Sequence, residues 1–190
     1  MKVLRTFFAC IGVIVFALSS ASFAEDAAIR DISISNSSAH LHLRFRLANT
    51  FSPRMEEAIN DGIPAVFTFY VELFQERSIR GDNLISSFSF TKTLKYNALK
   101  KEYTITEQNN KGNGDIAVEL STLHEAKKQM NSINIPSLYP MWKLDRNKNY
   151  YFRIKAESKG IEPPLFLNYL LFFLKWMNFE TPWVVERFSY

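Results

Sequence analysis

Hydrophobic and polar residues alternate along residues 32–47. Ile32 and Ile34 alternate with polar residues, and the turn-forming Asn-Ser-Ser sequence at 36–38 follows them. The apolar positions beyond this turn are Leu41, Leu43, Phe45 and Leu47, and the polar positions are His40, His42, Arg44 and Arg46. A period of two with one apolar face is typical of strands that bury one side. The pattern therefore predicts two half-buried strands that pair as a hairpin.

The next segment, residues 52–62, changes to the period of a helix. Ser52 is a favourable N-cap, and the apolar residues after it are spaced to lie on one helix face. Gly62 stands where helices often end with a residue of positive φ, and Pro64 prevents the helix from continuing. The segment therefore predicts a short helix that stops at Gly62 and a strand that starts after Pro64.

Further strands are predicted beyond this stop. Residues 65–74 are apolar on both faces, which predicts a central strand covered on both sides. The return strand, residues 84–96, has one apolar face interrupted by Lys92, and residues 102–106 and 150–157 are two shorter strands. Between them, Thr122 and Glu125 have the spacing of a capping box, and they predict a short helix.

Six antiparallel strands and two short helices favour a mainly β protein, an antiparallel β-sandwich that is immunoglobulin-like in general architecture. An aromatic content of 15%, with 17 Phe among 190 residues, also favours strands. The length suits one domain. We therefore expect residues 25–190 to form a single sandwich-like domain that includes an apolar C-terminal segment, residues 163–190, and we consider a helix for its apolar stretch, residues 165–179.

The C-terminal segment allows two interpretations. Between Leu165 and Leu174 only Asn168 is polar, and the apolar character continues to Phe179. A helix of roughly 15 residues spans about 22 Å, less than the ~30 Å of a bilayer core, so it is too short to cross a membrane. It would either pack on the sandwich or contact a membrane surface through Leu165 to Phe179. We favour packing, because a small sandwich needs cover for its apolar strands.

The N-terminus has the features of a secretory signal peptide. Lys2 and Arg5 precede an apolar run over 7–18, and small residues at Ser22 and Ala24 suit a cleavage site. We expect residues 1–24 to direct export, into the periplasm of a Gram-negative bacterium, with an uncleaved anchor as the alternative. The only cysteine, Cys10, lies in this segment, so the mature chain would contain no disulfide or thiol.

An ordered set of motifs resembles a bacterial family of exported proteins, domain of unknown function 4390. The motifs are "IRDISI", "HLHLRFRL", "EEAINDGIPAVFTFYVEL", "KTLKYNALKKEYTI", "HEA" and "LDRNKNYYFRIKAE", with tryptophans near the end. Tyr96 and Tyr103 stand at the family's spacing within the fourth motif. The resemblance implies an uncharacterised envelope protein and supplies no catalytic residues. In some bacteria such proteins are encoded beside a membrane sensor kinase, which would suggest a regulatory partner.

Candidate chemistry is sparse. His40 and His42 would lie on one side of a strand, where two imidazoles can share a metal ion. Arg44 and Arg46 continue that side and oppose a cation, so we expect no metal and no cofactor. The mature chain would have no thiol, and the sequence has no Gly-x-Ser-x-Gly elbow. The sequence therefore favours a protein that is not an enzyme.

The charge of the chain bears on the class of its binding partner. The formal net charge is +4, and it falls to +2 without Lys2 and Arg5, which is too small to argue for nucleic acid. Arg44, Arg46, Arg153 and Lys155 all lie on predicted outward faces, and they would form a basic interaction face if their strands were neighbours. The alternative is a solvated sheet surface.

We expect a non-enzymatic periplasmic interaction domain with a protein partner in the envelope. The alternative is a lipid-associated factor that uses the C-terminal segment.

Overall fold

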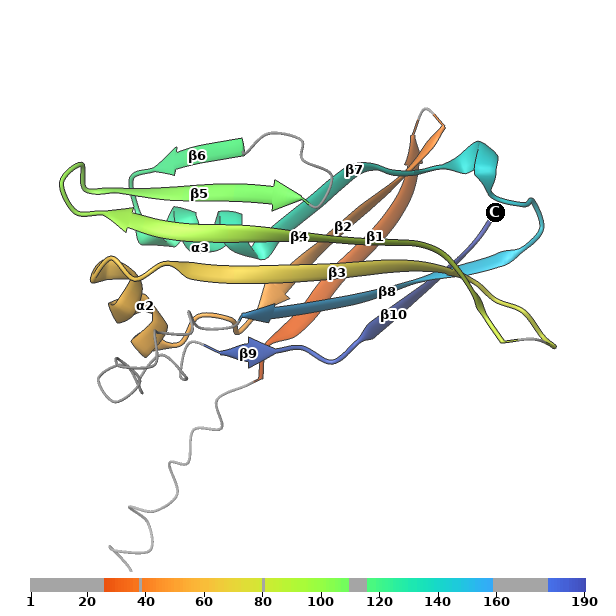
Figure 1. The fold of residues 1–190 in the computed structure, drawn as a ribbon, viewed down its shortest axis with the longest axis horizontal. Helices are drawn as coiled ribbons and strands as arrows, with labels where there is room; N and C mark the ends of the chain where they lie inside the picture. The colour runs from red at the N-terminus through yellow and green to blue at the C-terminus, as the bar shows by residue number, and fades with distance from the viewer. Residues whose placement is uncertain (1–25, 38, 80, 110–115, 159–177) are drawn as a thin grey trace, which may run out of the picture.

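The computed structural model describes residues 26–37, 39–79, 81–109, 116–158 and 178–190. Within these ranges the chain forms two antiparallel sheets around a common hydrophobic core, with two α-helices and a short 3-10 helix (Figure 1). The predicted mainly β, antiparallel sandwich is confirmed. The predicted signal peptide and the apolar C-terminal stretch up to residue 177 lie outside the described residues.

The smaller sheet has the strand order β1-β2-β7. Its strands are β1 (Ala28–Ser37), β2 (His40–Ala48) and β7 (Ser132–Pro140). The predicted hairpin is present, since β1 pairs antiparallel with β2. The four large apolar residues of β2 are all buried in the core, so its polar residues face outward.

The larger sheet has the order β10-β8-β3-β4-β5-β6, with β9 beside β8. Its strands are β3 (Ala65–Gln75), β4 (Asn83–Asn97), β5 (Glu102–Asn109), β6 (Ile116–Leu120), β8 (Asn149–Ser158), β9 (Phe179–Glu180) and β10 (Val184–Ser189). The prediction that β3 is central is confirmed, because it lies between β4 and β8. The prediction that both its faces are covered is wrong, because every second residue of β3 is only half-buried.

The helices extend the layer that covers the larger sheet. Helix α2 (Pro53–Asn60) packs against β4, and α3 (Leu123–Asn131) packs against β4, β5 and β6 (Figure 1). Their buried residues, Met55, Ala58, Ile59, Ala126 and Met130, belong to the same core as the two sheets. None of the helices in the described ranges is long and apolar enough to span a membrane.

The predicted ends of α2 are present. The Ser52 hydroxyl accepts a hydrogen bond from the Met55 N–H at 3.2 Å. At the other end Gly62 has a φ of +88°, and its N–H donates to the Ile59 carbonyl at 2.9 Å. The N–H of the next residue also reaches back into the helix, which completes a Schellman motif. The chain then leaves the helix before Pro64, and β3 begins one residue later.

Two tyrosines fasten the end of α2 to the larger sheet. Tyr96 and Tyr103 are cross-strand partners on β4 and β5, with ring centroids 4.7 Å apart. The Tyr103 hydroxyl donates to the Asn60 side-chain oxygen at 2.6 Å. Both residues therefore have structural contacts.

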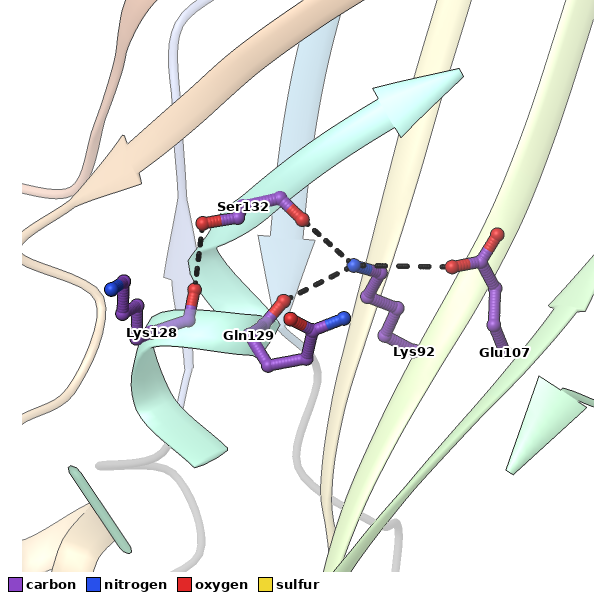
Figure 2. Close-up of polar contacts among 5 residues, drawn as sticks. All are labelled: Lys92, Glu107, Lys128, Gln129 and Ser132. Atoms are coloured by element: carbon purple, nitrogen blue, oxygen red, sulfur yellow. Dashed lines mark hydrogen bonds and ion pairs between the residues drawn. The ribbon is translucent and has the colours of Figure 1, made fainter. Parts of the chain in front are cut away.

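A buried cation joins the larger sheet to the start of β7. Lys92 lies on the inner face of β4 and is 5% exposed. Its ammonium donates to the backbone carbonyls of Ser132 at 2.9 Å and Gln129 at 3.2 Å, and it lies 3.9 Å from the Glu107 carboxylate (Figure 2). Burial lowers the pKa of Lys92, and the charge of Glu107 partly opposes this shift. Lys92 therefore holds the point where α3 passes directly into β7.

Four of the strands were not predicted. They are β6, β7, β9 and β10. Strand β7 contains Pro136, which cannot donate a backbone hydrogen bond, and it follows α3 with no turn signal between them. Because β7 is an edge strand, it tolerates the proline.

Candidate functional site

The predicted histidines lie together on the outer face of the smaller sheet. His40 contacts the Trp142 ring edge-to-face at 5.9 Å, which gives it an aromatic neighbour. In the described part of the chain, no group of three or more His, Cys, Asp or Glu side chains is arranged to hold a metal ion. Only two imidazoles are therefore available here, and the absence of a metal stays a prediction.

The four predicted cations do not form one face. Arg44 and Arg46 belong to β2 in the smaller sheet, whereas Arg153 and Lys155 belong to β8 in the larger sheet. The outer faces of two packed sheets point in opposite directions. The proposed common patch is therefore wrong, because β2 and β8 lie in different layers and are not paired.

Arg153 and Lys155 belong instead to a mixed surface on the outer face of the larger sheet. Strand register assembles it, because Lys155 lies opposite Tyr70 on β3 and Arg153 lies opposite Val185 on β10. Seven side chains, which we call the cation–aromatic ladder, are linked by ring contacts: Tyr70, Phe74, Tyr151, Arg153, Lys155, Trp183 and Arg187. They come from three neighbouring strands and the segment just before β10.

Rings and cations contact one another along the ladder. The Tyr151 and Phe74 rings are stacked, with centroids 5.2 Å apart and planes at 9°. The Arg153 guanidinium lies 4.6 Å from the Trp183 ring and 5.6 Å from the Phe74 ring. Arg187 lies 5.9 Å from the Tyr151 ring. Cation–π contacts at such distances are favourable, and here they order long side chains on a rigid sheet.

Carboxylates accompany each cation of the ladder. The ion pairs join Arg153 to Glu72 (3.7 Å), Arg187 to Glu76 (2.8 Å), and Lys155 to Glu157 (3.9 Å) and Glu180. The hydrogen bond to Glu180, more than any other contact, raises the pKa of Lys155. The surface therefore displays fixed charges of both signs and does not form a basic patch.

An open cleft of about 1010 Å³ adjoins one end of the ladder. Its lining comes from the turn after β3 and from the loop before β8: residues 75–79, Asp82, Asp145 and 147–149. The Tyr151 hydroxyl donates to the Asp82 carboxylate at 2.7 Å, and the Arg77 N–H donates to the same carboxylate at 3.0 Å. These hydrogen bonds lower the pKa of Asp82, while burial and the Asp82 contact raise the pKa of Tyr151. The cleft and the ladder are therefore contiguous.

The ladder exposes aromatic and apolar side chains beside its cations. Trp183 is 37% exposed, and Val185 beside it is also exposed. Trp, Tyr and Arg are the residue types that most often dominate binding energy at protein interfaces. These residue types make the ladder a candidate binding surface.

Sequence reasoning identified only two members of the ladder, Arg153 and Lys155. It missed Trp183 and Arg187 because β10 was not predicted. The burial of residues 184–189 alternates in the structure, but their sequence, Val-Val-Glu-Arg-Phe-Ser, does not alternate between apolar and polar residues. A six-residue strand after a long apolar stretch is therefore a weak pattern on its own.

Comparison with known proteins gives one result. A family model described as domain of unknown function (DUF4390) matches residues 24–186, which include every described element apart from the last residues of β10. Neither the search of curated proteins nor the search of solved structures found a match.

Proposed function

The chain belongs to the DUF4390 family, whose description assigns no activity, and we propose from the chain's own surface that it is a non-enzymatic interaction domain. In this proposal it acts in the periplasm, to which the predicted signal peptide would direct it. It binds a protein partner of the envelope through the cation–aromatic ladder. The partner's surface would have an apolar or aromatic centre and charges of both signs around it.

The contact of the Arg153 guanidinium with both the Trp183 ring and the Phe74 ring carries this proposal. A guanidinium that already contacts two rings, with Arg153 and Phe74 on paired strands and Trp183 directly before β10, loses little side-chain entropy on binding. Such pre-ordered aromatic and arginine side chains suit the centre of a protein interface. The carboxylates around them disfavour a polyanionic partner, because they would repel phosphate groups.

A site-specific cross-linking experiment tests the proposal. A photoreactive amino acid is placed at Val185, beside the ladder, in the full chain expressed in its native host. The matched control places it at Leu99, which is fully exposed on the β4–β5 turn. We expect an adduct of one defined mass from Val185 and none from Leu99.

Two substitutions then connect the adduct to the ladder. Trp183→Ala or Arg153→Ala should abolish the Val185 adduct while the melting temperature of the purified protein changes little. An adduct that forms equally at both positions, or that is unaffected by both substitutions, would contradict the proposal.

A further inference from the structure

Strand β10 forms one edge of the larger sheet, beside the ladder. It pairs with β8 on one side, and no strand of the described residues pairs with its other side. The opposite edge of this sheet is β6, which spans five residues and lies away from the ladder (Figure 1). An edge strand presents unpaired backbone N–H and C=O groups, which can pair with a strand of another chain. Within the described ranges, the open side of β10 is such an edge.

The hydrogen bonds of β8 show which backbone groups of β10 point to this edge. On β8, the Ala156 N–H donates to the Thr181 hydroxyl at 3.0 Å, and the Ala156 carbonyl accepts from the Thr181 N–H at 2.9 Å. Directions alternate along an antiparallel strand, so the groups of Ile154 also point toward β10 and pair with Val184. Every second residue after Val184 likewise pairs with β8. The residues between them direct their backbone groups to the open edge: Val185, Arg187 and Ser189.

Two of the other three edges have features that hinder strand addition. Strand β1 has a register shift beside Asp31, whose φ is 53°. Strand β7 contains Pro136, followed by Ser137 with a φ of 56°, and it passes directly into η1 (Met141–Lys143). Bulges and prolines of this kind interrupt an edge. Strand β10 has neither, because its register with β8 is unbroken over Val184–Ser189.

A half-buried carboxylate faces inward in the middle of β10. Glu186 lies between Val184 and Phe188 on the inner side of the strand, and both of these apolar neighbours pack against the core. On β8 it lies opposite Phe152, which is fully buried. No cation of the described residues lies at ion-pair distance from Glu186. An inward-pointing charge on an edge rejects a strand with an apolar residue opposite it and favours a strand that supplies the opposite charge.

We propose that the protein partner adds an extended strand to β10 and places a lysine or arginine opposite Glu186. The inference rests on the proposed function, and it states how the partner of the ladder binds. Backbone hydrogen bonds to the open edge of β10 would hold the added strand. Side chains opposite each other on neighbouring strands lie on the same face of a sheet. The partner's residues on either side of the basic one would therefore face outward, beside Val185 and Arg187, and continue the ladder.

A second copy of this chain fits the edge less well. Consider two β10 strands paired antiparallel so that their ladders share one side of a continuous sheet. The two registers with the largest overlap then place either both Glu186 side chains or both Arg187 side chains opposite each other. Like charges opposite each other destabilise a sheet. A strand of different sequence avoids this repulsion.

Photo-cross-linking at Ser189 tests the added strand in the full chain, expressed in its native host. Ser189 is exposed and lies at the open edge, and its use leaves position 185 free for substitution. Val185→Pro removes an N–H that β8 does not use, and its ring obstructs an added strand, whereas Val185→Thr keeps the N–H and the β-branched shape. We expect Val185→Pro to lower the adduct yield about tenfold or more, and Val185→Thr to change it less than about twofold.

Charge at position 186 provides a second test, which does not depend on a proline. Glu186→Lys should lower the adduct yield about tenfold, and Glu186→Gln about two- to fivefold, because each removes the attraction to the partner's cation and the first adds repulsion. The matched control is Glu119→Lys, which reverses an exposed charge on β6 and should leave the yield unchanged. The Glu186 variants should melt close to the natural protein, because the described residues give this side chain no ion pair to lose.

The outcomes separate this inference from the proposed function. An adduct that survives Val185→Pro and Glu186→Lys but is lost with Trp183→Ala would overturn the added strand and leave the proposed function intact. No adduct from either Val185 or Ser189 would overturn both. An adduct with twice the mass of the chain would assign the edge to a second copy and would also overturn the proposal.

Discussion

Lys92→Met tests how the larger sheet is joined to the α3–β7 junction. Methionine keeps the length and the apolar stem of the lysine side chain but cannot donate a hydrogen bond. The substitution removes the donor from the carbonyls of Gln129 and Ser132 and the ion-pair partner from Glu107. It also removes a cation that is almost fully buried.

The lost hydrogen bonds destabilise the fold, whereas removal of the buried charge stabilises it. The difference between the two effects sets the expected change in the free energy of unfolding. Two partly buried carbonyls without this donor would cost at most about 2–6 kcal/mol, and relief from burying the ammonium offsets part of this. We expect the free energy of unfolding to fall by roughly 1–3 kcal/mol, which lowers the melting temperature by about 2–4 °C for each kcal/mol at this chain length. Urea unfolding followed by circular dichroism measures the change.

The pH dependence provides an independent check. Burial lowers the pKa of Lys92 in the folded protein, whereas the unfolded chain keeps the ordinary value near 10.5. Between the two values the unfolded state binds more protons, so this lysine makes stability rise with pH there. The unfolding free energy of the natural protein, minus that of Lys92→Met, should therefore increase as pH approaches 10.5. Other titrating groups cancel in this difference.

The control is Lys95→Met, which alters an exposed lysine on the same strand and should change stability by less than about 0.5 kcal/mol. Hydrogen exchange should show that Lys92→Met accelerates exchange in α3 more than in β8. A Lys92→Met variant as stable as the natural protein would refute the argument, because burial of the charge would then outweigh its hydrogen bonds. A stability difference that is independent of pH would refute the stated pKa shift.

Gly62→Val should lower the free energy of unfolding by about 1–2 kcal/mol, because φ at Gly62 is +88°. An added Cβ would meet no atom within 4 Å, so this cost comes from the backbone conformation and not from a clash. Gly62→Asn should cost less, and equal, near-zero effects in urea unfolding would contradict a strained backbone here. Tyr103→Phe should lose about 0.5–1.5 kcal/mol with its hydrogen bond to Asn60, and an unchanged thermal melt would show that this bond adds no stability. The melting temperature should be the same with and without EDTA, and a large fall would instead assign a metal to His40 and His42.

The sequence predicts local structure well where a pattern repeats. The alternation in β2 identifies which of its residues enter the core, and the cap residues Ser52 and Gly62 identify both ends of α2. These features depend on neighbours within a few positions, whose physical preferences are visible in the sequence. Even the interruption at Lys92 is visible as a polar residue on an apolar face.

The sequence does not predict how these elements combine. The alternating patterns around Arg44 and Arg153 look alike, yet one strand belongs to the smaller sheet and the other to the larger sheet. Lys92 is paired with backbone carbonyls 37 and 40 positions further along, and carbonyls have no residue-type signature. The ladder likewise depends on the register of β10 beside β8. Candidate sites that depend on such pairing could not be located from local patterns.

The connection of α3 to β7 has a consequence for how the chain folds. Strand β7 completes the smaller sheet, but it is synthesised long after β2, and the paired residues Arg44 and Asn134 are 90 positions apart. An isolated two-stranded hairpin is only marginally stable in water, so β1 and β2 expose their apolar side until the later strands are available. Distant pairing of this kind slows folding, and unfinished sheets are prone to aggregate. The N-terminal hairpin, which has the clearest pattern in the sequence, is therefore the part of a newly made chain that most needs protection by a chaperone.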